Sequence, residues 1–243
     1  MSHIIRGSLF LLPLLGVLAR EARSAQASSD AGIYTVDASS RLVVKTGKAG
    51  LFGFAGHTHL IRARTVTGEL VYRPGGPKSS LRLRVLTDSL EVLTPPDTAE
   101  IRKVTEAMRT DVLHVDRFPT MTFAADAVDA QTGKVGLQLA VTMEGVTRTL
   151  PMTAEVTIGA DTIRATGAFT AKQTDFGIKP FSGGPAGTVK VADKVTFCFD
   201  LVAVRRGAGP GGPRALGSAS AATGVPGCVD NAKTKAEAER RPL

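Results

Sequence analysis

Hydrophobic and polar residues alternate with a period of two through most of the chain between residues 33 and 206. The segment 149–158, TLPMTAEVTI, places its leucine, methionine, alanine, valine and isoleucine on one face and mainly threonine and glutamate on the other. Successive side chains of a strand point to opposite faces, so this alternation predicts a strand with one apolar face. Segments 120–128, 135–144 and 191–204 repeat the pattern. Several such strands separated by short turns predict an antiparallel β-sandwich or barrel.

One segment has helical spacing instead. Ile101, Val104, Met108 and Val112 recur every three or four residues within 96–119, which predicts a helix over 97–111. The predicted fold class is therefore all-β with one inserted helix, an antiparallel lipocalin-like β-barrel. About eight strands of this kind close around a space that holds one small ligand or is filled by side chains.

A closed barrel aims the apolar faces of its strands at one interior. The predicted interior is apolar and suits an apolar guest, although a barrel packed solid with its own side chains is the open alternative. The side chains that we expect to face the lumen, and to contact a bound lipid, are Met121, Phe123, Val141, Met143, Met152, Ala154, Phe169, Phe176, Phe197 and Phe199.

Both ends of the chain differ from its middle. Residues 1–27 combine Arg6, a short apolar run and Ala25-Gln26-Ala27, which predicts a secretory signal peptide cleaved near Ala27. The apolar run is too short to span a bilayer, so we expect no transmembrane segment in the mature chain. Residues 207–243 are rich in glycine, alanine, proline and serine without apolar periodicity, which predicts a disordered tail. The predicted domains are thus a signal peptide (1–27), a barrel (28–206) and a tail (207–243).

Charge and cysteine content refine this interpretation. The net charge of the chain is +8, of which residues 28–206 carry +4 without a basic cluster, so nucleic acid is not an expected partner. Of the two cysteines, Cys198 lies in a predicted strand and Cys228 in the tail. An exported protein permits a disulfide, but a disordered tail is a poor partner, so we expect Cys198 to be a small unpaired residue of the core or of the barrel wall.

Four elements in order resemble the YceI-like family. They are YTVD (34–37), RFPTMTFAADAV (117–128), VTMEGVTRTLPMTAEV (141–156) and TDFGI (174–178), and FAGHTHLI (54–61) resembles the branch with a Gly-His-x-His element. Pro119, Gly145 and Asp175 match positions that mark the fold of that family. In the first turn, however, this chain has Ala38-Ser39 where other branches have His-Ser.

The resemblance implies an exported bacterial protein, periplasmic or secreted, with an extended lipocalin-like barrel. It implies a bound polyisoprenoid or isoprenoid quinone as the apolar lipid ligand, no cofactor and no catalysed reaction. The oligomeric state is open, and a homodimer is one alternative.

His57 and His59 are the remaining candidates for chemistry. Two residues apart on a strand, they face the same side and could hold one metal ion, or hydrogen-bond a ligand headgroup at the barrel mouth. A metal site needs further ligands, and His114 is the only other histidine after residue 27. We therefore expect either a structural role, in which the imidazoles hydrogen-bond to backbone or carboxylate groups and fix the loop 47–56, or a ligand-mouth role. A metal-binding protein or a metal-dependent hydrolase is the alternative.

Overall fold

The computed structural model describes residues 31–49, 58–75, 78–93, 98–183, 189–207 and 228. Most of the regular structure in these residues is β-strand. The strands of the main sheet are β1 (Gly32–Val36), β2 (Arg41–Lys45), β4 (Leu60–Ala63), β5 (Val66–Tyr72), β6 (Ser79–Leu86), β7 (Leu90–Val92), β8 (Thr120–Val128), β9 (Gly133–Met143), β10 (Val146–Ile158), β11 (Thr162–Lys172) and β14 (Lys194–Arg205). A second, small sheet consists of β3 (Lys48–Ala49), β12 (Ser182–Gly183) and β13 (Val189–Val191). Two 3₁₀ turns cover Thr87–Ser89 and Gln173–Phe176.

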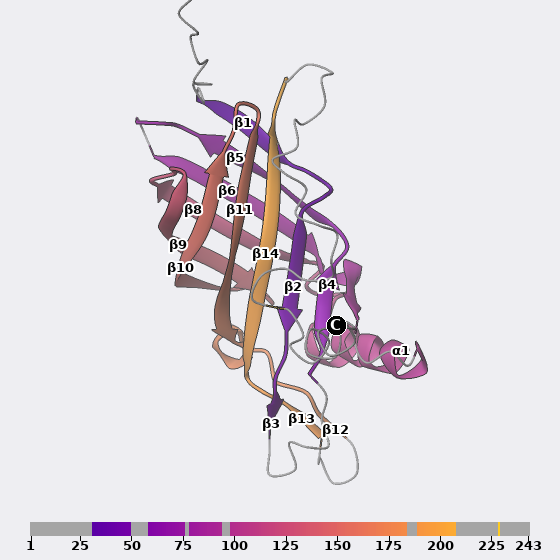
Figure 1. Cartoon of the computed structure of the whole chain (residues 1–243). Helices are drawn as coiled ribbons and strands as arrows, with labels where there is room; N and C mark the ends of the chain where they lie inside the picture. The colour runs from indigo at the N-terminus through magenta and orange to yellow at the C-terminus, as the bar shows by residue number, and fades with distance from the viewer. Residues whose placement is uncertain are drawn as a thin grey trace, which may run out of the picture.

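Eight of the described strands close into an antiparallel barrel (Figure 1). Their order is β1-β5-β6-β8-β9-β10-β11-β14, and β14 pairs back with β1. At this closure Tyr34 faces Arg205 in register, and Arg205 Nη2 donates a hydrogen bond of 2.6 Å to the Tyr34 hydroxyl. The predicted barrel of about eight antiparallel strands is confirmed.

The sheet continues beyond the barrel because β14 has two neighbours on one side. Its residues Ala203–Arg205 pair with β1, whereas Thr196–Asp200 pair with β2. β2 in turn pairs with β4, and β4 pairs with β7. These three strands, called here the sheet extension, lie at the end of the barrel where the helix and the small sheet are found (Figure 1).

The predicted helix is confirmed. Helix α1 spans Thr98–Ala107 and runs into a π-helical turn over Met108–Val112, while residue 97 lies outside the described residues. Met108 and Val112 are buried, and Val104 packs against the core.

Among the described residues, no helix has the length and apolar character needed to cross a membrane.

The inward face of β14 carries Phe197 and Phe199. Phe199 pairs with Gly167 of β11, where a Cβ atom would lie 2.7 Å from Phe199 Cζ. Glycine is therefore needed at position 167 for the ring to pack across the neighbouring strand.

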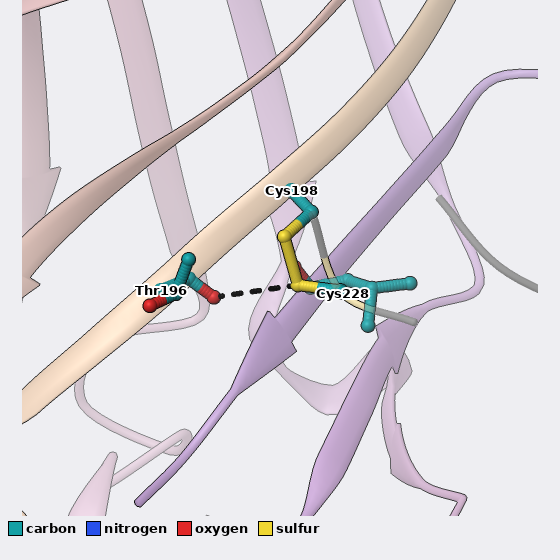
Figure 2. Close-up of a disulfide and its surroundings, with 4 residues drawn as sticks. Thr196, Cys198 and Cys228 are labelled. Atoms are coloured by element: carbon teal, nitrogen blue, oxygen red, sulfur yellow. Dashed lines mark hydrogen bonds between the residues drawn. A yellow bond between two sulfur atoms is a disulfide. The ribbon is translucent and has the colours of Figure 1, made fainter. Parts of the chain in front are cut away.

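The outward face of β14 carries a disulfide between Cys198 and Cys228 (Figure 2), with the two Cα atoms 5.8 Å apart. Cys228 Sγ lies 3.9 Å from the carbonyl oxygen of Thr196, and both half-cystines are buried against Val43 and Leu60. The prediction that Cys198 is unpaired is wrong. Low complexity in a segment does not exclude one covalent anchor, because a disulfide requires only that two Cα atoms come within about 7 Å.

The domain boundaries stay predictions. The predicted signal peptide lies outside the described residues, as do 208–227 and 229–243 of the predicted tail.

Candidate ligand-binding site

The interior contains a cavity of about 440 Å³ at the helix end of the barrel. Its wall is formed by the sheet extension, by helix α1 with its π turn, by the adjoining ends of β6, β8, β9 and β14, and by β13 together with the segment that follows β11. Its lining is mainly aliphatic and includes Leu42, Val44, Ile61, Val92, Val104, Met108, Met121, Met143 and Phe197. A cavity lined in this way favours an apolar ligand. We call it the large cavity.

Five polar side chains also line the large cavity: Thr46, His59, Lys103, Gln173 and Lys190. Thr46 and His59 are adjacent, since the Thr46 hydroxyl accepts a hydrogen bond from the His59 backbone N–H at 3.1 Å. Gln173 Nε2 donates to the backbone carbonyl of Ala192 at 2.9 Å, which fixes the orientation of its amide. Thr46 and Gln173 are buried whereas Lys103 and Lys190 are exposed, so the polar lining reaches the protein surface at the two lysines.

A second cavity, of about 110 Å³, lies within the eight-stranded barrel and is called here the small cavity. Its lining residues are all apolar and come from all eight strands of the barrel and from β2. They include Leu81, Leu83, Phe123, Leu137, Ala154, Phe169 and Phe199. The barrel is therefore not packed solid.

Three phenylalanine rings lie between the two cavities. The rings of Phe169 and Phe197 are stacked, with centroids 4.9 Å apart and an interplanar angle of 2°. Phe123 meets Phe169 edge to face at 6.4 Å and Phe197 at 6.0 Å. Phe197 lines the large cavity, whereas Phe123 and Phe169 line the small one.

The residues predicted to face the lumen divide between these features. Met121, Met143 and Phe197 line the large cavity, and Phe123, Met152, Ala154, Phe169 and Phe199 line the small one. Val141 and Phe176 are buried at 0% and 1% exposure, inside the core cluster.

Sequence reasoning missed most of the large cavity, namely the residues of the sheet extension and of α1. The apolar alternation of Leu42 and Val44 in RLVVK (41–45) was a usable signal. The pairing of that strand beside the barrel depends on contacts distant in sequence, with β14, and five residues do not specify such a partner.

The histidines do not come together as a metal site in the described residues. His57 lies outside those residues, and His59 lines the large cavity. His114 Nδ1 is 2.7 Å from Glu144 Oε1, at the turn between β9 and β10. No group of three histidine, cysteine, aspartate or glutamate side chains suited to a metal occurs in the part of the chain that the structure describes.

Residues 34–203 match the sequence model of the YceI-like domain. No curated protein matches the chain.

Two solved structures have a similar fold. Burkholderia cenocepacia BcnA is 18% identical, with a TM-score of 0.54 over 69% of this chain and 98% of that one. A polyisoprenoid binding domain from Saccharophagus degradans, implicated in plant cell wall breakdown, is 14% identical, with a TM-score of 0.54 over 71% of this chain and 98% of that domain.

Proposed function

Because the chain belongs to the YceI-like domain family, we propose that it binds one apolar isoprenoid lipid, a polyisoprenoid or an isoprenoid quinone, inside its barrel. The similar domain from Saccharophagus degradans is described as polyisoprenoid binding, which supports this ligand class. Burial of each methylene group contributes about 0.8 kcal/mol before the cost of ordering the chain.

The observation that carries the proposal is the large cavity. Native cores have few voids larger than a water molecule, whereas this cavity of about 440 Å³ is open at one end and mainly aliphatic. Its polar lining reaches the surface at Lys103 and Lys190, where the headgroup of a lipid would leave the protein. His59 lines this cavity, and in this proposal its imidazole contacts the quinone carbonyl or another polar headgroup.

We also propose that the protein acts by binding and not by catalysis. In the described part of the chain, the polar lining of the large cavity consists of a threonine, a histidine, a glutamine and two lysines. The Thr46 hydroxyl accepts a hydrogen bond from the backbone N–H of His59, whereas a hydroxyl nucleophile is activated by a base that takes its proton.

Export to the periplasm or the medium is part of the same proposal. The signal-peptide pattern of residues 1–27 supports it. The Cys198–Cys228 disulfide also supports it, since disulfides persist mainly in oxidising compartments.

The proposal is tested by native mass spectrometry of protein expressed with its own leader and purified from the exported fraction. We expect a chain that begins near Ser28 and carries about one molecule of an apolar lipid, which solvent extraction releases. An intact leader would contradict export. A protein that is free of lipid and does not take up added isoprenoid would contradict the binding function.

A pair of helix variants localises the ligand. Ala107 lines the large cavity and Ala99 is exposed on the same helix, so Ala107→Phe and Ala99→Phe make the same change at different places. We expect Ala107→Phe to lose most of the lipid at a stability cost of about 1–3 kcal/mol, and Ala99→Phe to retain it. Equal lipid content in two folded variants would place the ligand elsewhere.

A further inference from the structure

The boundary between the two cavities falls at the same level on four strands. On β6 the lining passes from Leu83, in the small cavity, to Val85, in the large one. On β8 the same change occurs from Phe123 to Met121, and on β14 from Phe199 to Phe197. On β9 it falls between Leu139 and Met143, at the fully buried Val141. The two cavities are thus one lumen divided by a layer of side chains.

The dividing layer is built from the three phenylalanine rings and Val141. Val141 pairs with Phe123 in register, and Phe169 pairs with Phe197. All four side chains are at most 8% exposed, and the stacked pair places one ring on each side of the division. Moving these rings requires repacking of the core, so the layer is a fixed end to the large cavity.

The polar end of the large cavity lies opposite this layer. β2 runs from Leu42, which borders both cavities, through Val44 to Thr46 at the polar end. β4 is antiparallel to β2, so its chain runs in the opposite direction, from His59 at the polar end through Ile61 to Ala63 near the layer. A bound chain therefore has a defined direction, with its polar head near Thr46 and its apolar end against the phenylalanines.

The volume of the large cavity limits how much of a chain it can bury. A cavity of about 150 Å³ accommodates benzene, which is roughly 25 Å³ per carbon atom. The 440 Å³ of the large cavity then holds roughly 18 carbons, or three to four isoprene units of five carbons each. The small cavity, at 110 Å³, would add about one more unit if the layer were absent.

We propose that the layer of Phe123, Val141, Phe169 and Phe197 sets the length of isoprenoid chain that the protein buries. This inference rests on the proposed lipid-binding function and assigns it a ligand class, a chain with three to four buried isoprene units. Units beyond the fourth stay outside the protein and add nothing to affinity.

The test is a series of all-trans prenols with 10, 15, 20 and 30 carbons, bound to the delipidated protein and measured by fluorescent-lipid displacement. For the wild type we expect the dissociation constant to fall at least tenfold from the 10-carbon to the 20-carbon prenol. From 20 to 30 carbons we expect a change of less than threefold. Affinity that keeps rising tenfold or more to 30 carbons would overturn the length limit and leave the lipid-binding function intact, whereas no binding at any length would overturn both.

Removing one ring should move the limit. In Phe197→Ala the two cavities merge, and we expect the 30-carbon prenol to bind at least fivefold more tightly than the 20-carbon one. Phe118→Ala is the control, because Phe118 is a partly buried phenylalanine that lines neither cavity, and we expect it to keep the wild-type length limit. A folded Phe197→Ala with an unchanged limit would overturn the role of the layer. If Phe197→Ala does not fold, Phe197→Leu takes its place in the same comparison, and the wild-type series still tests the length limit.

Discussion

Asp200 is a buried carboxylate on the outer face of the barrel. It is 3% exposed and accepts hydrogen bonds from Arg164 Nε and Nη2, both at 2.7 Å, and from Arg41 Nη2 at 2.8 Å. Burial alone would raise the pKa of Asp200, but the hydrogen bonds from Arg164 and Arg41 outweigh it and hold the pKa below its ordinary value. The residue therefore links three adjacent strands, β11, β14 and β2, through charge-assisted hydrogen bonds.

Removing this charge should destabilise the barrel. Asp200→Asn leaves two partly exposed arginines without their shared carboxylate, and we expect a loss of about 2–3 kcal/mol in the free energy of unfolding, measured by urea titration at neutral pH. The control is Asp126→Asn, which breaks the exposed pair with Arg82 and should cost under about 1 kcal/mol. Similar losses in the two variants would contradict the assigned role of Asp200.

The same ion cluster should give a pH dependence. The folded state binds the Asp200 proton less readily than the unfolded state, so the carboxylate stabilises the fold at neutral pH. That contribution should begin to be lost as the pH falls below about 4, the ordinary aspartate pKa, and should be gone below the lowered folded-state pKa. Urea titrations at falling pH should accordingly bring the wild type and Asp200→Asn closer together.

At the scale of elements, helix α1 is held over the large cavity by an arginine from its π turn. Arg109 Nη2 donates hydrogen bonds to the backbone carbonyls of Asp88 and Leu90, which lie in the 3₁₀ turn and at the start of β7. Hydrogen bonds to a charged group contribute about 1.5–3 kcal/mol each, and solvent weakens the bond to Asp88, which is exposed, more than the bond to Leu90, which is partly buried. This tether joins the helix to the sheet extension across the cavity wall.

We predict that Arg109→Met loosens the helix and leaves the barrel intact. Methionine keeps an apolar stem but has no donor for the two carbonyls. Hydrogen exchange should become about tenfold faster or more in residues 98–112, with little change in β9 and β10. Arg102→Met, at an exposed position of the same helix, is the control and should exchange like the wild type. Uniformly faster exchange in the whole chain would instead indicate loss of global stability.

The elements differ in how far the sequence predicts them. Strands of nine to thirteen residues such as β8, β9 and β10 carry their own alternation, and the helix carries its own spacing, so these elements and the phenylalanines of the lumen could be predicted. The sheet extension could not, because β2, β4 and β7 have only five, four and three residues. Their places depend on long-range pairing, of β2 with β14, of β4 with β2 and of β7 with β4, and local periodicity does not encode which partner a short strand takes.

At the scale of the whole molecule, the disulfide connects residue 228 to a strand that ends 23 residues earlier, at Arg205. It closes a loop with a sequence separation of 30 residues. The disulfide also packs against Val43 on the outer face of the barrel, and neither Val43 nor Cys198 lines a cavity. The C-terminal segment is therefore joined to the barrel wall and leaves the ligand site unobstructed by this contact.

The last prediction concerns what the C-terminal segment contributes to stability. In the chain-entropy model, closing a loop of about 30 residues stabilises the folded state by roughly 3–4 kcal/mol, which corresponds to a melting temperature higher by about 6–16 °C for a domain of this size. We expect Cys228→Ser, Cys198→Ser and the double variant to lose this amount equally, because all three remove one bond.

A chain ending at Arg206 should have the same melting temperature as these cysteine variants if the segment acts only through its disulfide. A truncated chain that is less stable than Cys228→Ser would mean that other residues after 206 pack on the barrel, and one that melts like the wild type would mean that the bond adds no stability.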